Sequence, residues 1–364
     1  MGTTAATTFA RRALEGHTSM LARFERRDGA LRRDGRFALP GVEAHLWPFA
    51  RAFVATLDVA GIPAPLVAGS RLDADAVITR RLRALERYWD ERGPAYASDP
   101  PHLLSRVLGG GDIYHDDNAW AGLALVQLAR QRPGHSRLDR AAQLADFARA
   151  GWDTNPAAPH PGGVFWVQQG RGLGARNHDR NTISTAPNAE LILHLEALDG
   201  DSAASAHEPD PAQMAGWVTD CLGNGEDLFR DKIRGDGTID AALWSYNQGS
   251  MLGLHALLAG RDGPEAADHM RQAQAIARAA LDHYEDRRYT GEPAEFVAIF
   301  MRNLLLLSAR SEDEPLRRRI AQAVRERAAA MWPIAPAATL LEHSAAVTLQ
   351  ALAAWDPSDL TLLA

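Results

Sequence analysis

The sequence alternates between two kinds of helical segment, and this alternation restricts the fold more than any other feature. We expect helices over 5–27, 44–61, 73–92, 115–132, 137–152, 184–198, 211–229, 247–259, 265–284, 294–310, 315–332 and 341–355. The odd-numbered segments carry one apolar stripe, as at Leu138, Ala141, Ala145 and Ala148, which is typical of a helix with one face in a core. The even-numbered segments, such as "EFVAIFMRNLLLL", are apolar on nearly every side. A helix that is apolar all round is buried all round.

Striped segments that alternate with fully buried ones predict two concentric rings of helices. This arrangement is an all-α fold, the (α/α)6 toroid of six helical hairpins, and we expect residues 1–364 to form a single domain of this kind. A helical solenoid is the alternative, but a solenoid favours a more regular repeat than this chain has. The clearest strand signal is a short β-hairpin in "FRDKIRGDGTIDAALW", with its turn at Gly235-Asp236-Gly237.

Composition narrows the classes of partner. The net charge is -7 and no basic stripe is present, which argues against nucleic acid. No apolar segment reaches the length of a membrane span, and the single cysteine, Cys221, excludes an intrachain disulfide. The N-terminal stretch lacks an apolar run suited to a signal peptide, so we expect a cytoplasmic protein, or a secreted one if a leader has been removed. The histidines have no metal-ligand spacing, so neither a metal nor a cofactor is expected.

The starts of the even-numbered segments hold more polar and aromatic side chains than an N-cap requires. Carboxylates and amides hydrogen-bond hydroxyl groups, and flat rings cover the apolar faces of pyranoses. In a toroid the inner helices begin at one end of the barrel, so these side chains are expected to meet around a sugar. They are Glu43, His45, Trp47, His115, Asp116, Asp117, Asn118, Trp120, Thr185, Asn188, Glu190, Trp244, Tyr246, Asn247, Gln248, Glu292, Glu295, Glu342 and His343.

The adjacent pair Asp116 and Asp117 is the most informative feature at these starts. One aspartate in a first turn is explained by its favourable interaction with the helix dipole. Successive helical residues point about 100° apart, so both carboxyls reach one site from different angles. Their repulsion and partial burial are expected to raise the proton affinity of one of them. One ionised and one protonated carboxyl is the pairing that glycoside hydrolysis uses, although from the residues alone a helix start explains the pair equally well.

Four motifs together resemble a known family. "YHDDNAW" at 114–120 is similar to the catalytic motif of glycoside hydrolase family 76, the endo-α-1,6-mannanases. "GGVFW" at 162–166 and "WSYNQG" at 244–249 resemble two further motifs of that family, and "NTISTAPNAE" at 181–190 occupies the place of a third. The resemblance is good over about 105–260 and extends to the flanking helices by pattern only.

The resemblance implies a toroidal retaining hydrolase that cleaves α-1,6-mannosidic linkages in mannan or mannooligosaccharides. Carried over by motif, Asp116 is the nucleophile and Asp117 the general acid/base. The motifs and the helix starts together predict substrate contacts from His115, Asn118, Trp120, Phe165, Trp166, Asn188, Trp244, Tyr246, Asn247 and Gln248. The expected partner is an α-mannan oligosaccharide or polysaccharide.

Two other functions remain open. A sugar epimerase or isomerase on the same toroid would use paired histidines on inner helices, for which His255 and His343 are the candidates. A non-catalytic glycan-binding protein would bind the same sugar without cleaving it. The fold does not distinguish these functions, so the arrangement of the site has to do so.

Overall fold

The computed structural model describes residues 2–34, 42–70, 72–100, 111–174, 176–199, 208–286 and 289–363. Helices dominate these residues. They are α1 (Gly2–Phe24), α2 (Leu46–Ala60), α3 (Ala74–Leu85), α5 (His115–Gln131), α6 (Leu138–Ala150), α7 (Thr182–Asp199), α8 (Pro211–Leu222), α9 (Ser245–Leu258), α10 (Ala266–Asp286), α11 (Ala294–Ser308), α12 (Glu314–Ala330) and α13 (Leu340–Leu352).

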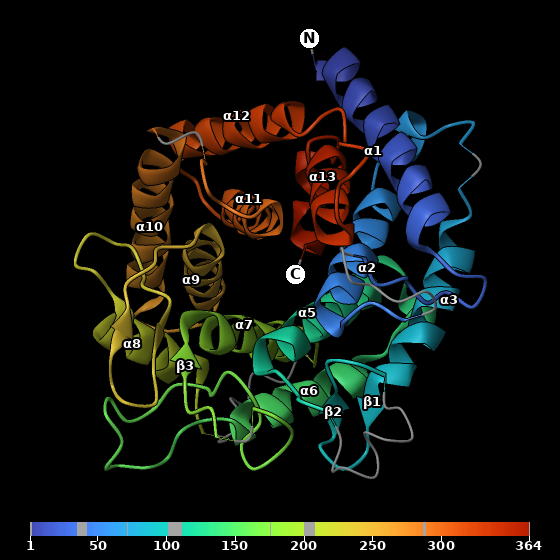
Figure 1. Ribbon diagram of the computed structural model, residues 1–364. Coiled ribbons are helices and arrows are strands. Elements are labelled where there is room, and N and C mark those ends of the chain that lie inside the picture. The colour runs from blue at the N-terminus through green and yellow to red at the C-terminus, as the bar shows by residue number, and fades with distance from the viewer. Residues whose placement is uncertain are drawn as a thin grey trace.

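The helices form two rings (Figure 1). Within the described chain the inner ring runs α2, α5, α7, α9, α11 and α13, each packed on the next, and α13 packs on α2 to close it. The helices α1, α3, α6, α8, α10 and α12 lie outside and pack on inner helices. The expected (α/α)6 toroid is therefore confirmed, and the open solenoid is wrong because the last inner helix contacts the first.

The burial pattern follows the sequence pattern of each ring. In the inner helix α9 every residue from Asn247 to Leu258 is buried. In the outer helix α12 the buried positions include Leu316, Ile320 and Val324, which lie four residues apart on one face. The free energy of burying apolar surface thus places each helix in its ring. No helix in the described ranges is both long and apolar enough to span a bilayer.

Small antiparallel sheets lie outside the helices. Strands β1 (Trp89–Asp90) and β2 (Ala95–Tyr96) form one pair, and β3 (Arg180–Asn181), β4 (Lys232–Ile233) and β5 (Ile239–Asp240) form a sheet in that order. The predicted β-hairpin is confirmed, since Ile233 pairs with Ile239 across the turn. Two predicted helices were too long. The segment 73–92 ends its α-helix at Leu85, and 211–229 ends at Leu222, where Gly223 begins an extended segment.

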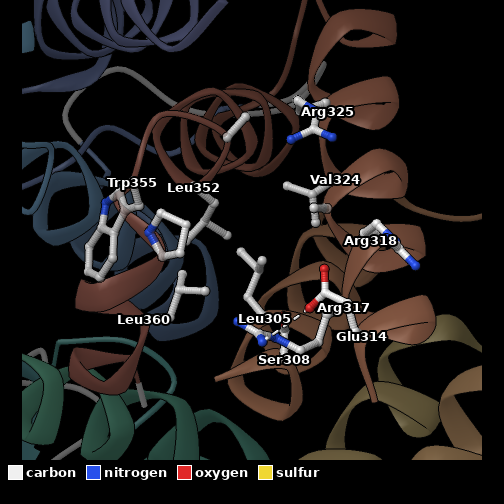
Figure 2. Close-up of a pocket in the computed structure, with 13 residues that line it drawn as sticks. Leu305, Ser308, Glu314, Arg317, Arg318, Val324, Arg325, Leu352, Trp355 and Leu360 are labelled. Atoms are coloured by element: carbon white, nitrogen blue, oxygen red, sulfur yellow. Dashed lines mark hydrogen bonds and ion pairs between the residues drawn. The ribbon is translucent and has the colours of Figure 1, made fainter. Parts of the chain in front are cut away.

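The opposite end of the barrel, where inner helices finish, carries a separate opening of about 230 Å³. It lies between the last turns of α11 and α13, the helix α12 and the 3-10 helix Pro357–Leu362. Figure 2 shows its apolar wall of Leu305, Val324, Leu352 and Leu360, with arginines of α12 along one side. None of its lining residues belongs to the helix starts singled out above.

Candidate active site

Asp116 and Asp117 lie in the first turn of α5, where the inner ring begins. The N-cap residue is Tyr114, and it makes no side-chain cap hydrogen bond. Both aspartates are partly exposed, whereas the helix is buried from Asn118 to Ala129. Neither aspartate therefore occupies the capping position, and the pair stands where the buried helix meets solvent.

The two carboxyl groups have different surroundings. Asp116 accepts hydrogen bonds from the amide of Asp117 at 3.0 Å and from Nε1 of Trp166 at 3.2 Å. Burial raises the pKa of Asp116 to about 7, and these two donors limit the rise because they stabilise the carboxylate. Burial, followed by the charges of Asp116 and Asp99, raises the pKa of Asp117 well above its usual value. The donors to Asp116 and the negative charge beside Asp117 both favour Asp117 as the carboxyl that keeps the proton.

Two glycines shape the loop that carries Trp166. Gly162 and Gly163 have φ values of 103° and 81°, which side chains with a Cβ rarely adopt. A Cβ on Gly163 would lie only 2.4 Å from the ring of Trp217, so the loop packs directly on this outer-helix side chain. The carbonyl of Trp166 accepts a 2.9 Å hydrogen bond from the amide of His115. This bond holds Trp166 against the start of α5, where its indole reaches Asp116.

The hairpin strand β4 and the residue before it add two charged residues that sequence analysis did not single out. Asp231 is buried, accepts a 3.4 Å hydrogen bond from Asn247, and lies close enough to Asp116 for its charge to raise the pKa of that carboxyl. Nζ of Lys232 lies 5.4 Å from the ring centroid of Trp166 and 3.5 Å from a carboxylate oxygen of Asp179. The available signal was their position directly before the hairpin turn, upstream of the "WSYNQG" motif.

An aromatic group lies at the starts of α9 and α11. The ring of Tyr246 stacks on Phe296 with centroids 3.7 Å apart, and Trp244 meets Phe296 edge-on at 5.8 Å. These three residues are partly exposed. Burial raises the pKa of the Tyr246 hydroxyl, and the charges of Asp231 and Asp116 raise it further. The aromatic group therefore shares the electrostatic environment of the aspartate pair.

Three amides predicted to bind substrate are buried and hydrogen-bonded to the backbone. Asn118 exchanges hydrogen bonds with the backbone amide and carbonyl of Tyr96, at 2.8 and 2.9 Å, and donates to the carbonyl of Tyr114. Gln248 makes the same set of bonds to the backbone of Phe229 and Trp244. Asn188 donates to the carbonyls of its own helix and of His115. An amide whose bonds are occupied in this way fixes the backbone beside the site.

The remaining predicted contacts divide into exposed and buried positions. His115 is 2% exposed and stacks on Phe147, a residue of the outer helix α6, at 4.1 Å, so its ring points away from the pair. Trp120 is 4% exposed, and Asn247 is buried. Phe165 is partly exposed and meets the ring of His178 at 6.2 Å. Trp166, Trp244, Tyr246 and Phe165 are therefore the predicted contacts with the larger solvent-exposed surfaces.

The histidines required by an epimerase are not brought together. His255 lies in the last turn of α9 and contacts His269 of α10. His343 lies in the first turn of α13 and its Nε2 contacts the carbonyl of Gly16 in α1. Each ring thus faces an outer helix. Across the described ranges, no group of three or more potential metal-binding side chains is present.

The other carboxylates at the helix starts have different places. Glu292 accepts hydrogen bonds from the amide and hydroxyl of Ser245 and so caps α9. Glu342 forms a capping box with Thr339 at the start of α13. Glu190 lies within α7 and is 1% exposed. These three carboxylates therefore have a structural partner or a buried position, whereas Asp116 and Asp117 are partly exposed to solvent.

Comparison with known proteins identifies close resemblances in sequence profile and in fold. The sequence profile of glycosyl hydrolase family 76 matches residues 106–337. No curated protein sequence gives a significant match. A family 76 glycoside hydrolase from a bovine Bacteroides thetaiotaomicron strain has a similar fold with a TM-score of 0.75 and 17% identity, covering 96% of this chain and 77% of that one.

Two further structures have the same fold. One is a family 76 mannosidase of Bacteroides thetaiotaomicron, with a TM-score of 0.74, 19% identity, and coverage of 95% of this chain and 98% of that one. The other is an inactive variant of an α-1,6-mannanase from Salegentibacter sp. in complex with α-1,6-mannotriose. Its TM-score is 0.71 at 16% identity, covering 96% of this chain and 99% of that one.

Proposed function

Because this chain belongs to glycosyl hydrolase family 76, we propose that it is a retaining hydrolase of α-1,6-mannosidic linkages in mannan or mannooligosaccharides. The observation that carries the proposal is the aspartate pair in the first turn of α5, where the amide of Asp117 and the indole of Trp166 donate to Asp116. The toroid, residues 1–364, acts in this proposal as one catalytic domain.

The two carboxyls have the surroundings that a double-displacement reaction requires. Ionised Asp116 attacks the anomeric carbon while protonated Asp117 transfers its proton to the departing glycosidic oxygen, which leaves an Asp116-linked glycosyl ester. A water molecule then attacks the same carbon as Asp117 takes its proton, and the ester bond breaks. Two inversions at one carbon retain the α configuration. The indole of Trp166 keeps Asp116 ionised by donating to it.

A structural neighbour supports these roles. The inactive variant of the Salegentibacter mannanase has two adjacent aspartates replaced by asparagine and holds α-1,6-mannotriose. This chain also has an adjacent aspartate pair, Asp116 and Asp117. The partly exposed rings of Trp166, Trp244 and Tyr246 provide flat apolar surfaces for pyranose faces beside the pair.

A proton NMR time course with α-1,6-mannotetraose tests the reaction. The first reducing end formed should carry the α configuration before mutarotation, and an initial β product would mean that the enzyme inverts. Proton exchange with solvent next to the reducing carbon, without cleavage, would indicate an epimerase or isomerase. Intact tetraose after long incubation would indicate a glycan-binding protein.

Variants separate the two aspartates. Asp116→Ala should lose activity on both the tetraose and an activated aryl α-mannoside, because no glycosyl-enzyme forms. Asp117→Ala should lose activity on the tetraose but still release the aryl group, because a good leaving group departs without a proton. Added azide should then yield the α-mannosyl azide. If both variants keep near-normal activity on the tetraose, the assigned roles are wrong.

A further inference from the structure

Two buried arginines near the barrel axis differ in their partners. Arg302 of α11 donates to both carboxylate oxygens of Asp58 and to Oε1 of Gln127, and the amide of Gln127 also donates to Asp58. This set links α2, α5 and α11 across the ring. Both carboxylate oxygens of Asp58 therefore already accept hydrogen bonds from Arg302, and one also accepts from Gln127.

Arg51 of α2 is as buried as Arg302, since each is 4% exposed. Among the described residues, however, Arg51 has neither a hydrogen-bond acceptor nor an ion-pair partner within 4.0 Å, and its nitrogen atoms are not closed off from solvent. Its charge lies near those of Asp58, Arg302 and Glu295. A buried cation with free donors is costly unless something else binds them.

The surroundings of Arg51 resemble the walls of a sugar site. Its Cζ atom lies 5.6 Å from the ring centroid of Trp47 and 5.8 Å from that of Trp120, and the two rings are 5.9 Å apart. Trp120 follows Asp116 by four residues and Asp117 by three, which places it next to the pair on one helix face. Arg51 is thus separated from the aspartate pair by one side chain, that of Trp120.

Glu295 completes this group from across the ring. It lies in the first turn of α11, is partly exposed, and interacts electrostatically with Arg51 without forming an ion pair within 4.0 Å. Because the cation of Arg51 and the carboxylate of Glu295 do not touch, they leave room for a group that accepts a hydrogen bond from Arg51 and donates one to Glu295. A hydroxyl does both, whereas a carboxylate or phosphate only accepts and would face Glu295 with like charge.

We propose that Arg51 and Glu295, with Trp47 and Trp120, form a subsite that binds the hydroxyl groups of a neutral, unsubstituted hexose unit of the glycan. The subsite lies on the α2 and α11 side of the aspartate pair, and Arg51 is its specificity-determining residue. The inference rests on the proposed function for the identity of the glycan.

Binding to the catalytically inactive Asp116→Asn/Asp117→Asn protein tests the subsite without turnover. In calorimetric titrations with α-1,6-mannotetraose, introducing Arg51→Met into this inactive protein should raise Kd about 10- to 100-fold, because charged donors to the sugar are lost. Arg51→Lys should recover part of the affinity. Inorganic phosphate should not compete with the tetraose. Unchanged affinity in Arg51→Met, or competition by phosphate, would overturn the assignment.

Melting temperature separates binding from a structural role. Arg51→Met should leave the melting temperature unchanged or higher, because an unpartnered buried charge is replaced by an apolar side chain. The matched variant Arg302→Met should lower it, because Asp58 loses its cation. A lower melting temperature in Arg51→Met would make Arg51 a structural residue and refute the inference. If the inactive parent binds no mannooligosaccharide, the proposed function fails instead, and the melting comparison still decides the role of Arg51.

Discussion

The hydrogen bond from Trp166 to Asp116 should set the acid limb of the pH profile. Trp166→Phe keeps a ring in place but removes the Nε1 donor that lies 3.2 Å from the carboxylate. That donor favours the ionised form, so its loss raises the pKa of Asp116. A hydrogen bond to a charged group contributes about 1.5–3 kcal/mol when buried. Since Trp166 and Asp116 are partly exposed, about half of this free energy applies. It corresponds to a rise of roughly 0.5–1 unit in the pKa of Asp116.

The assay is kcat/KM for α-1,6-mannotetraose between pH 4 and 10, because this ratio reports the ionisations of the free enzyme. Below the pKa of Asp116 the nucleophile is protonated, so the acid limb should move to higher pH in Trp166→Phe, while the basic limb moves little. Trp244→Phe is the matched control, since it removes an indole that packs on Phe296 and does not donate to Asp116. An unmoved acid limb, a shift to lower pH, or equal shifts in both variants would refute the reasoning.

Two further predictions concern stability and support of the pair. Burial raises the pKa of Asp117 in the folded protein, so this carboxyl favours folding below its unfolded pKa of about 4 and disfavours it increasingly above that value. Asp117→Asn should therefore raise the melting temperature more at pH 8 than at pH 4, and an equal change at both values would contradict a raised pKa. Asn118→Ala should lower stability by about 1–3 kcal/mol, measured by urea unfolding, because three backbone groups lose their partner. Gln248→Ala removes the same set of bonds from α9 and should cost a similar amount, but only Asn118→Ala should also reduce kcat strongly. Similar falls in kcat in the two variants would mean that Asn118 does not position Asp116 and Asp117.

The sequence alone determined the architecture and the place of the aspartate pair in it. Segments apolar on all sides and segments apolar on one side belong in different rings, because burial acts on each helix through its own surface. The predicted toroid, the hairpin turn at Gly235-Asp236-Gly237 and the position of Asp116 and Asp117 at the start of a buried helix all follow from this local information. The ends of helices did not follow from the pattern, as at Leu85 and Leu222, where a 3-10 turn and an extended segment follow.

Only the tertiary structure decided which side chains at the helix starts face the site. A helix without a polar stripe does not reveal which of its sides faces the axis, so Asn118 and Gln248 looked like substrate contacts in the sequence. In the folded chain their amides bind backbone 22 and 19 residues away. Conversely, Arg51 lies inside an apolar segment, and no local pattern indicates that Arg302 already occupies Asp58 or that Glu295 lies nearby. Such pairings depend on how the ring closes, because each partner comes from a different helix.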